Sequence, residues 1–330
     1  MLILSPAKIN LYLSVGPKRK DGFHEIRTLM ARLALADELR IETLPGRARP
    51  MGFQEGSLEL VLRFDRRYPQ PCRQALSENP EDNLALRAYR LLSGRFPKMA
   101  SRRARLTLVK RVPSGAGLGG GSSNAAAALI GLAKFFALDI GRDELMRLAA
   151  SLGSDVSFFI ASSPEFSPRP GSLWWASGRG ERLRAVPGRG VWPVLVIYPG
   201  FAMATAQAYQ ALDEAGHHAT LTKSGILPRL LRQLNETWPF DAPETDAASG
   251  RGSNQIGFNS FEQVVAPEDS LLNKLKKDLM NFGARAAALS GSGSCLWALG
   301  VSSADTRRLA RAVQEKYAGI NLAYYLSVIC

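Results

Sequence analysis

Apolar and polar positions alternate along the first residues of the chain. One face of the alternation carries Ile9, Leu11, Leu13 and Val15, and the other carries Lys8, Asn10, Tyr12 and Ser14. Side chains with a period of two point to opposite faces of a β-strand, so the pattern predicts a strand over residues 2–15. A lysine within such a strand is costly to bury unless its ammonium group finds a partner, which makes Lys8 a candidate functional residue.

The same patterns predict the other main elements. Strands are expected at residues 58–64, 105–110, 191–198, 286–290, 295–301 and 322–329. Helices are expected after Asn83 and at residues 122–137, 142–152, 205–212, 271–282 and 303–317. Ser122 and Ser123 are expected to cap the helix that they begin, and Gly153 to end the helix before it.

The length and the element order predict an α+β protein of two domains. A chain of 330 residues exceeds the size of a usual single core. Helices alternate with antiparallel strands in the second half, which favours a ferredoxin-like α/β sandwich there. We place the domain boundary between residues 1–160 and 161–330.

Composition is that of an ordinary folded protein, with 46% hydrophobic and 22% charged residues. The three cysteines are widely separated, and their spacing suggests neither a disulfide framework nor a zinc site. The first residues lack the pattern of a signal peptide, and the most apolar stretch is short and interrupted by prolines. We therefore expect a cytoplasmic protein with no membrane partner. The sequence leaves the oligomeric state open between a monomer and a weak dimer.

The net charge of +13 allows two interpretations. A strongly basic chain can bind a polyanion such as RNA, or its surface can steer a small anionic substrate. The sequence has no RNP-like motif, zinc knuckle or basic helix with interleaved aromatic residues. A nucleic-acid partner is therefore unlikely, and the steering role is favoured.

A glycine-rich segment between a predicted strand and a predicted helix carries the candidate chemistry. It comprises Pro113, Ser114, Gly115, Ala116, Gly117, Leu118, Gly119, Gly120, Gly121, Ser122 and Ser123. Glycines let the backbone approach a bulky anion and adopt positive φ, and the helix that follows adds its positive N-terminal end. The segment therefore predicts a phosphate-binding loop.

Three known types of phosphate loop fit this segment poorly. A Walker A loop ends in Gly-Lys-Ser/Thr, whereas Gly121 is followed directly by Ser122. The dinucleotide motif GxGxxG is matched, but Asp139, the acidic residue nearest the expected position, ends a helix instead of a strand. The HRD and DFG motifs of protein kinases are missing.

Residues 113–126 (PSGAGLGGGSSNAA) resemble the phosphate loop of GHMP kinases. Further motifs of that family appear in order as SPAKINLYL (5–13), DGFHEI (21–26), EDNLALRA (81–88), SLGSDVSFF (151–159), FNSFE (258–262) and SGSGS (290–294). The resemblance implies an N-terminal domain of ribosomal-protein S5-like type and a C-terminal ferredoxin-like domain. It also implies a small-molecule kinase that uses ATP and Mg²⁺, whose protein ligands stay unknown apart from Ser122 or Ser123 as candidates.

The resemblance further implies roles for individual residues. Asp155 matches the catalytic aspartate that takes the proton of the acceptor hydroxyl, and Lys8 matches a lysine that keeps it ionised and stabilises the transferring phosphoryl group. Asn83 and Lys110 match positions that border the nucleotide. The resemblance also implies a substrate with a cytidine diphosphate group, as in non-mevalonate isoprenoid synthesis. The residues that match its binding positions are Asn10, Phe23, His24 and Tyr209.

Alternative functions stay open at this point. They are a GHMP kinase for homoserine, a mevalonate derivative or a sugar, and a non-catalytic nucleotide- or RNA-binding protein. Ser157 stands where the family usually has proline, and the regions 45–80 and 241–255 are longer than usual. His217 and His218 are interpreted as surface residues of a polar turn.

Overall fold

The structure is a computed structural model that describes residues 1–44, 53–74, 79–101, 103–167, 173–186, 192–218, 225–235 and 255–329. Of the long region expected at 241–255, only Gln255 lies among the described residues. Parts of the region 45–80 lie outside them too.

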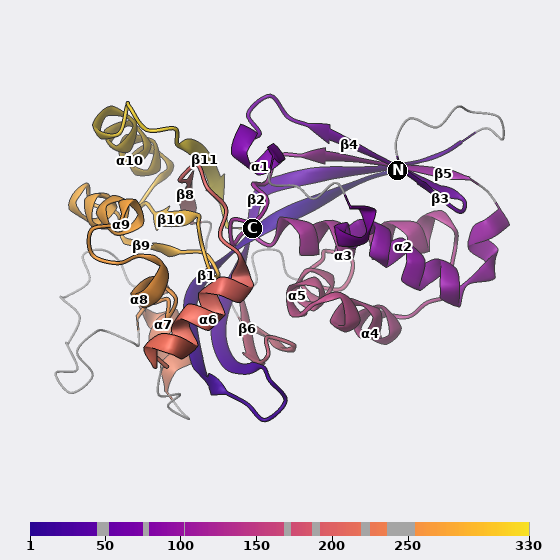
Figure 1. Cartoon of the computed structure of the whole chain (residues 1–330), viewed down its shortest axis with the longest axis horizontal. Helices are drawn as coiled ribbons and strands as arrows, with labels where there is room; N and C mark the ends of the chain where they lie inside the picture. The colour runs from indigo at the N-terminus through magenta and orange to yellow at the C-terminus, as the bar shows by residue number, and fades with distance from the viewer. Residues whose placement is uncertain are drawn as a thin grey trace. The chain divides into compact units, whose positions relative to one another are not determined.

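The strands and helices follow one another as Figure 1 labels them. The strands are β1 (Leu2–Lys18), β2 (His24–Thr43), β3 (Phe53–Glu55), β4 (Leu58–Phe64), β5 (Ala104–Lys110), β6 (Leu173–Gly178), β7 (Arg182–Val186), β8 (Pro193–Tyr198), β9 (Ala286–Leu289), β10 (Leu296–Leu299) and β11 (Ala323–Val328). The α-helices are α1 (Gln70–Gln74), α2 (Leu84–Arg95), α3 (Gly120–Phe135), α4 (Arg142–Leu152), α5 (Ser154–Ala161), α6 (Thr205–Ala215), α7 (Ile226–Asn235), α8 (Glu262–Val265), α9 (Leu271–Asn281) and α10 (Ser303–Lys316). Short 3₁₀ turns cover η1 (Pro80–Asp82) and η2 (Pro97–Ser101).

Contacts divide the chain into two compact units. Unit 1 comprises Met1–Ala7, Leu35–Ser114 and Gly119–Arg169, and unit 2 comprises Lys8–Ala34, Gly115–Leu118 and Pro170–Cys330. The long strands β1 and β2 and the glycine-rich segment therefore each contribute residues to both units. The consecutive division into 1–160 and 161–330 stays a prediction about folding domains.

Unit 1 packs helices against strands β3, β4, β5 and the second half of β2. Strand β4 pairs with β5 in parallel, and β5 pairs with β2 in antiparallel register. Helix α3 is buried along most of its length because its small residues allow close packing. At Gly131 a Cβ atom would lie only 2.4 Å from Ile3 Cδ1 and 2.7 Å from Ile41 Cδ1.

Unit 2 contains an antiparallel sheet in the order β11-β8-β10-β9. Helices α9 and α10 bury their apolar faces against it, with Leu275, Leu279, Leu309 and Val313 in the shared core. In the same unit, β6 pairs with the first half of β2 and with β7. Figure 1 shows α9 and α10 side by side near the C-terminal sheet.

The sequence patterns predicted most of these elements. The strand at 58–64 and the helix at 142–152 are confirmed with their predicted bounds, and Gly153 does end α4. The prediction that Ser122 and Ser123 cap α3 is wrong, because the helix begins earlier and its N-cap is Gly119 in the left-handed conformation. Helix α5 and strands β6 and β7 had no predicted counterpart.

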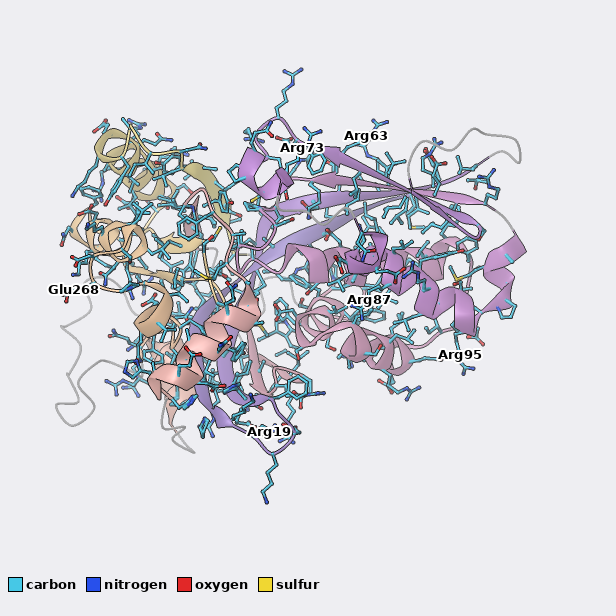
Figure 2. The ribbon with its side chains drawn as sticks, viewed as in Figure 1. Arg19, Arg63, Arg73, Arg87, Arg95 and Glu268 are labelled. Atoms are coloured by element: carbon cyan, nitrogen blue, oxygen red, sulfur yellow. The ribbon has the colours of Figure 1, made fainter. Side chains whose placement is uncertain are left out.

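The basic residues of unit 1 are spread over several elements. Arg63 comes from β4, Arg73 from α1, and Arg87 and Arg95 from α2 (Figure 2). Some of them have structural partners, since Arg95 Nε lies 3.1 Å from Glu144 Oε1 and the Arg73 guanidinium lies 4.5 Å above the Phe64 ring. Within the described part of the chain, the helices are all too short or too polar to cross a membrane.

Candidate active site

The glycine-rich loop connects β5 to α3 and needs glycine at particular positions. Gly115, Gly117 and Gly119 have φ values of 64°, 78° and 68°, in the left-handed region that other residues rarely occupy. At Gly117 a Cβ atom would lie 1.8 Å from the carbonyl oxygen of Ser290. The Ser290 hydroxyl donates a 2.8 Å hydrogen bond to the Gly117 carbonyl. The SGSGS segment therefore fixes the middle of the loop within unit 2.

The N-terminus of α3 has the properties of an anion site. Its cap residue, Gly119, offers no side-chain hydrogen bond, and the first turn of this described helix contains no acidic residue. The first backbone N–H groups of a 16-residue helix are thus available to a phosphate group with the helix dipole in its favour. Ser122 is half-buried in this turn, whereas Ser123 is buried and accepts a 2.9 Å hydrogen bond from Ser5.

A buried polar network in unit 1 holds the two segments that flank this loop, the end of β5 and the first turns of α3. The Asp37 carboxylate is fully buried and accepts hydrogen bonds from the backbone N–H groups of Arg111 and Val112, at 2.6 and 2.8 Å. It also binds the Lys110 ammonium group, which donates in turn to Asn124 Oδ1 at 2.9 Å. The network therefore ties the end of β5 to the first turns of α3.

This placement bears on the predicted nucleotide contact of Lys110. Its side chain is 4% exposed, and its ammonium nitrogen would lie 3.5 Å from a Cβ atom at Gly120. Lys110 thus lies directly behind the start of α3, where it positions the loop.

Lys8 and Asn10 meet on one face of β1 in unit 2, and both are buried. Asn10 Oδ1 accepts from Lys8 Nζ at 2.7 Å and from the backbone N–H of Gly291 at 2.9 Å, while its Nδ2 donates to Thr28 at 2.8 Å. A Cβ atom at Gly291 would lie 3.4 Å from Lys8 Nζ. The amide of Asn10 therefore fixes the Lys8 ammonium next to the SGSGS backbone.

The aromatic residues expected at the substrate lie together in part. The rings of His24 and Tyr209 have centroids 5.0 Å apart and planes tilted by 30°. Tyr209 is also held edge-on by Phe261, at 4.8 Å. Phe23 is 51% exposed, and the Arg179 guanidinium lies 4.7 Å above its ring. The structure thus groups His24 with Tyr209 and leaves Phe23 largely in solvent.

Two further candidates lie in unit 1. Asp155 is half-buried in the first turn of α5. Asn83 is the N-cap of α2, where its side-chain oxygen accepts from the backbone N–H groups of Ala85 and Leu86, at 3.0 and 3.3 Å. Asn83 therefore has a structural role that its position before a helical pattern could have indicated.

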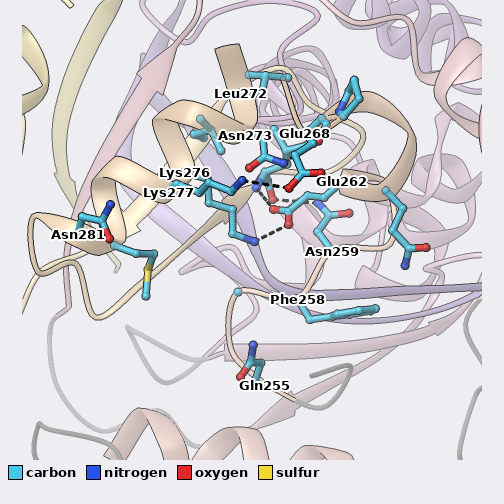
Figure 3. A pocket seen from close by; sticks show the side chains of 17 residues that line it. Gln255, Phe258, Asn259, Glu262, Glu268, Leu272, Asn273, Lys276, Lys277 and Asn281 are labelled. Atoms are coloured by element: carbon cyan, nitrogen blue, oxygen red, sulfur yellow. Dashed lines mark hydrogen bonds and ion pairs between the residues drawn. The ribbon is translucent and has the colours of Figure 1, made fainter. Parts of the chain in front are cut away.

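The FNSFE segment lines a pocket of about 830 Å³ in unit 2 (Figure 3). Asn259 donates to the carbonyl oxygens of Leu289 and Gly291, at 2.9 and 2.8 Å. Glu262 accepts from the Leu289 backbone N–H at 2.9 Å and from Lys276 at 2.5 Å. Burial raises the pKa of Glu262 above its ordinary value, although Lys276 opposes the rise. The segment therefore supports the backbone that leads into SGSGS.

Sequence reasoning quoted FNSFE and SGSGS as motifs but assigned no role to their residues. The structure gives Ser290 and Gly291 direct contacts with the loop and with Asn10. Thr28, which holds the amide of Asn10, had no sequence signal, because the contact depends on the pairing of β1 with β2.

Comparison with known proteins identifies the family. The GHMP kinases N terminal domain matches residues 83–163, and the GHMP kinases C terminal domain matches residues 244–319. A 4-diphosphocytidyl-2-C-methyl-D-erythritol kinase of Bacteroides thetaiotaomicron is 33% identical over 91% of this chain and 92% of its own. One from Syntrophus aciditrophicus is 35% identical over 90% of this chain and 88% of its own.

Solved structures agree with these matches. The crystal structure of a 4-(cytidine 5'-diphospho)-2C-methyl-D-erythritol kinase superposes with a TM-score of 0.70 at 28% identity and covers the whole of both chains. A homoserine kinase from Cytophaga hutchinsonii shares the fold, with a TM-score of 0.59 at 16% identity. The chain therefore belongs to the GHMP kinases, and within them to the family of 4-diphosphocytidyl-2-C-methyl-D-erythritol kinases. It is a small-molecule kinase with the predicted α+β fold.

Proposed function

We propose that this chain transfers the γ-phosphoryl group of ATP, with Mg²⁺, to a hydroxyl of 4-diphosphocytidyl-2-C-methyl-D-erythritol. The observation that carries the proposal is the near-full-length match to kinases named for that substrate, at 33–35% identity. The N-terminus of α3, with no acidic residue in its first turn and no side-chain cap, supports the use of a phosphate-rich cosubstrate.

Asp155 takes the proton of the acceptor hydroxyl. In phosphoryl transfer a protein contributes mainly positioning and charge stabilisation. A carboxylate that orients the acceptor hydroxyl contributes the positioning. Lys8 supplies positive charge to the transferring phosphoryl group, and Asn10 and the Gly291 N–H hold its position. Ser122, a half-buried hydroxyl in the first turn of α3, would be a ligand of Mg²⁺, which would supply positive charge to the phosphates when bound.

The cytosine base lies against His24 and Tyr209. The tilted pair of rings offers stacking surface, and the imidazole offers a polar edge for hydrogen bonds to the base. Phe23 adds exposed aromatic surface at the same end of β2. A homoserine, mevalonate or sugar kinase has no base for such residues to recognise.

ATP consumption with Mg²⁺ should be measured against the cytidyl substrate, homoserine, mevalonate phosphate and galactose. Turnover of the cytidyl substrate alone is expected. Turnover of another compound instead would overturn the substrate assignment while leaving the kinase assignment in place. Absence of turnover with all four, in protein that binds ATP, would favour a non-catalytic nucleotide-binding role.

The proton acceptor is tested by Asp155→Asn. The change keeps the shape of the side chain but removes its basicity, so kcat should fall by about 10²–10⁴-fold with little change in the melting temperature. Asp143→Asn is the matched control, because Asp143 is an exposed aspartate in the first turn of α4. Equal effects of the two changes would overturn the role of Asp155.

A further inference from the structure

Three potential metal ligands converge in unit 2. His24 at the start of β2, Asp213 in α6 and His218 just after α6 place one ligand atom each within 4.8 Å of one another. Nε2 of His24 and Nε2 of His218 both lie 3.4 Å from Oδ1 of Asp213. The three side chains come from separate segments, so the fold itself brings them together.

The hydrogen bond of the other His24 nitrogen fixes the ring for metal binding. His24 Nδ1 lies 2.9 Å from the carbonyl oxygen of Gly16. A carbonyl oxygen only accepts, so Nδ1 carries a proton, and the tautomer with that single proton presents the Nε2 lone pair to Asp213. Metal-binding histidines usually have this arrangement, with one nitrogen donating to a carbonyl and the other free to ligate.

Two hydrogen-bond acceptors that face each other repel unless a proton or a metal ion lies between them. A charge-assisted N–H···O hydrogen bond would bring nitrogen and oxygen to about 2.7–2.9 Å, which is shorter than both 3.4 Å separations. A tetrahedral ion with bonds of about 2.1 Å separates its ligand atoms by about 3.4 Å. The two separations from Asp213 Oδ1 therefore match a metal ion better than a shared proton, and the two histidine ligand atoms lie within 4.8 Å of each other.

The cluster borders solvent on one side, since the side chains of Asp213 and His218 are 29% and 21% exposed, whereas that of His24 is 5% exposed. Lys18 Nζ approaches the other oxygen of Asp213, Oδ2, at 3.7 Å, and its side chain is 59% exposed. Nδ1 of His218 is buried and makes no hydrogen bond within the described part of the chain. No hydrogen bond at Nδ1 among the described residues therefore fixes the tautomer of His218, and its Nε2 can present a lone pair to Asp213 Oδ1.

We propose that His24, Asp213 and His218 form a site for a transition-metal ion of the Zn²⁺ class. Two imidazoles and one carboxylate suit such an ion, and water can complete a tetrahedral set. Its ligands do not include Ser122, the proposed ligand of Mg²⁺. A bound ion occupies His24 Nε2 and so competes with the base of the substrate, a consequence that rests on the proposed function.

Zn²⁺ binding to the metal-free full chain should be measured by calorimetry. Wild type and His217→Ala are expected to bind one ion per chain, since His217 is the exposed neighbour outside the cluster. His218→Ala and Asp213→Asn should each weaken binding by at least about tenfold. Cys72 and Cys295 are fully buried, so they compete little for the ion.

Several outcomes decide the proposal. Lack of binding by wild type, unchanged affinity in His218→Ala, or an equal loss in His217→Ala would each overturn the site. With Co²⁺ in place of Zn²⁺, the visible bands of a tetrahedral ion should appear in wild type and vanish in His218→Ala. Circular dichroism of the variants separates a lost ligand from a lost fold.

Kinetics test the consequence for the substrate separately. Zn²⁺ should raise KM for the cytidyl substrate in wild type and His217→Ala, and His218→Ala should be resistant. Tight Zn²⁺ binding without any change in KM would keep the metal site and overturn the contact of His24 with the base. Lack of turnover of the cytidyl substrate would overturn the proposed function, while calorimetry would still decide the metal site.

Discussion

Each unit buries a lysine beside the glycine-rich loop, and the two lysines are held differently. In unit 1, Lys110 pairs with the fully buried carboxylate of Asp37. In unit 2, Lys8 donates to the amide oxygen of Asn10, next to the Gly291 backbone. A carboxylate neutralises the charge of an ammonium group, whereas an amide oxygen accepts a hydrogen bond from the ammonium group and orients it. The comparison indicates a structural role for Lys110, whereas the part of Lys8 in the chemistry stays a proposal.

The largest effect on stability is expected from Asp37→Ala. It leaves the Lys110 charge and two backbone N–H groups buried without the carboxylate, which should cost about 3–5 kcal/mol of unfolding free energy in urea. Glu38→Ala is the control, because Glu38 contacts Arg40 and Arg111 nearer the surface, and it should cost about 1 kcal/mol or less. Similar losses in both variants would remove the structural distinction drawn for Lys110.

A second variant sharpens the test. Adding Lys110→Met to Asp37→Ala removes the stranded charge, so part of the lost stability should return. If the double variant is less stable than Asp37→Ala alone, the cost lies elsewhere in the network.

Gly117→Ala tests the unit 2 side of the loop. The new Cβ atom would meet the Ser290 carbonyl at 1.8 Å with φ at +78°, so we expect a loss of about 2–3 kcal/mol and a raised KM for ATP. Gly121→Ala, in helix α3, is the control, since its Cβ atom would lie 3.8 Å from Cδ1 of Leu84 in helix α2. Thermal unfolding and ATP kinetics of the pair should diverge, and parallel behaviour would contradict the packing of Gly117 on SGSGS.

The sequence predicted the elements on either side of the loop better than the contacts that hold them. Period-two alternation located β1 and β4, and helical spacing located α4. It did not predict that both faces of β1 are buried, with Lys8 and Asn10 each 4% exposed. Burial of the second face depends on segments far along the chain, such as Trp297, whose indole N–H donates to the Asn10 carbonyl.

In the candidate site, too, the local feature was predicted from the sequence and the long-range contacts were not. The loop was visible because glycine at positive φ is a local requirement. Asp37, Thr28 and Asp213 were missed because each acts through partners far away in sequence, and a lone polar residue in a strand or helix has no local signature. His218, interpreted from its polar turn as a surface residue, lies 5.6 Å from the His24 ring, centroid to centroid.

Ser157→Ala should stabilise the chain slightly. The Ser157 hydroxyl in α5 is buried and makes no hydrogen bond within the described residues, so its removal should gain about 1 kcal/mol in urea unfolding. Ser123→Ala is the opposite case, because the Ser123 hydroxyl accepts from Ser5, and it should lose about 1 kcal/mol. A loss of stability in Ser157→Ala would show that this hydroxyl has a partner.

The smallest effect concerns pH and a second carboxylate–lysine pair, Glu262 with Lys276, which is less deeply buried than Asp37 with Lys110. Burial raises the pKa of Glu262 above its ordinary value of 4.5. The folded chain therefore holds this proton more tightly than the unfolded chain, and stability falls as pH rises from the ordinary pKa through the raised one. Glu262→Gln still accepts from the Leu289 N–H and should remove this fall, on the order of 1 kcal/mol between pH of about 4 and 7. Glu268→Gln, at an exposed pair with Lys277, should keep it. An unchanged pH profile in Glu262→Gln would mean that ionising Glu262 costs the folded chain no more free energy than ionising an exposed carboxylate.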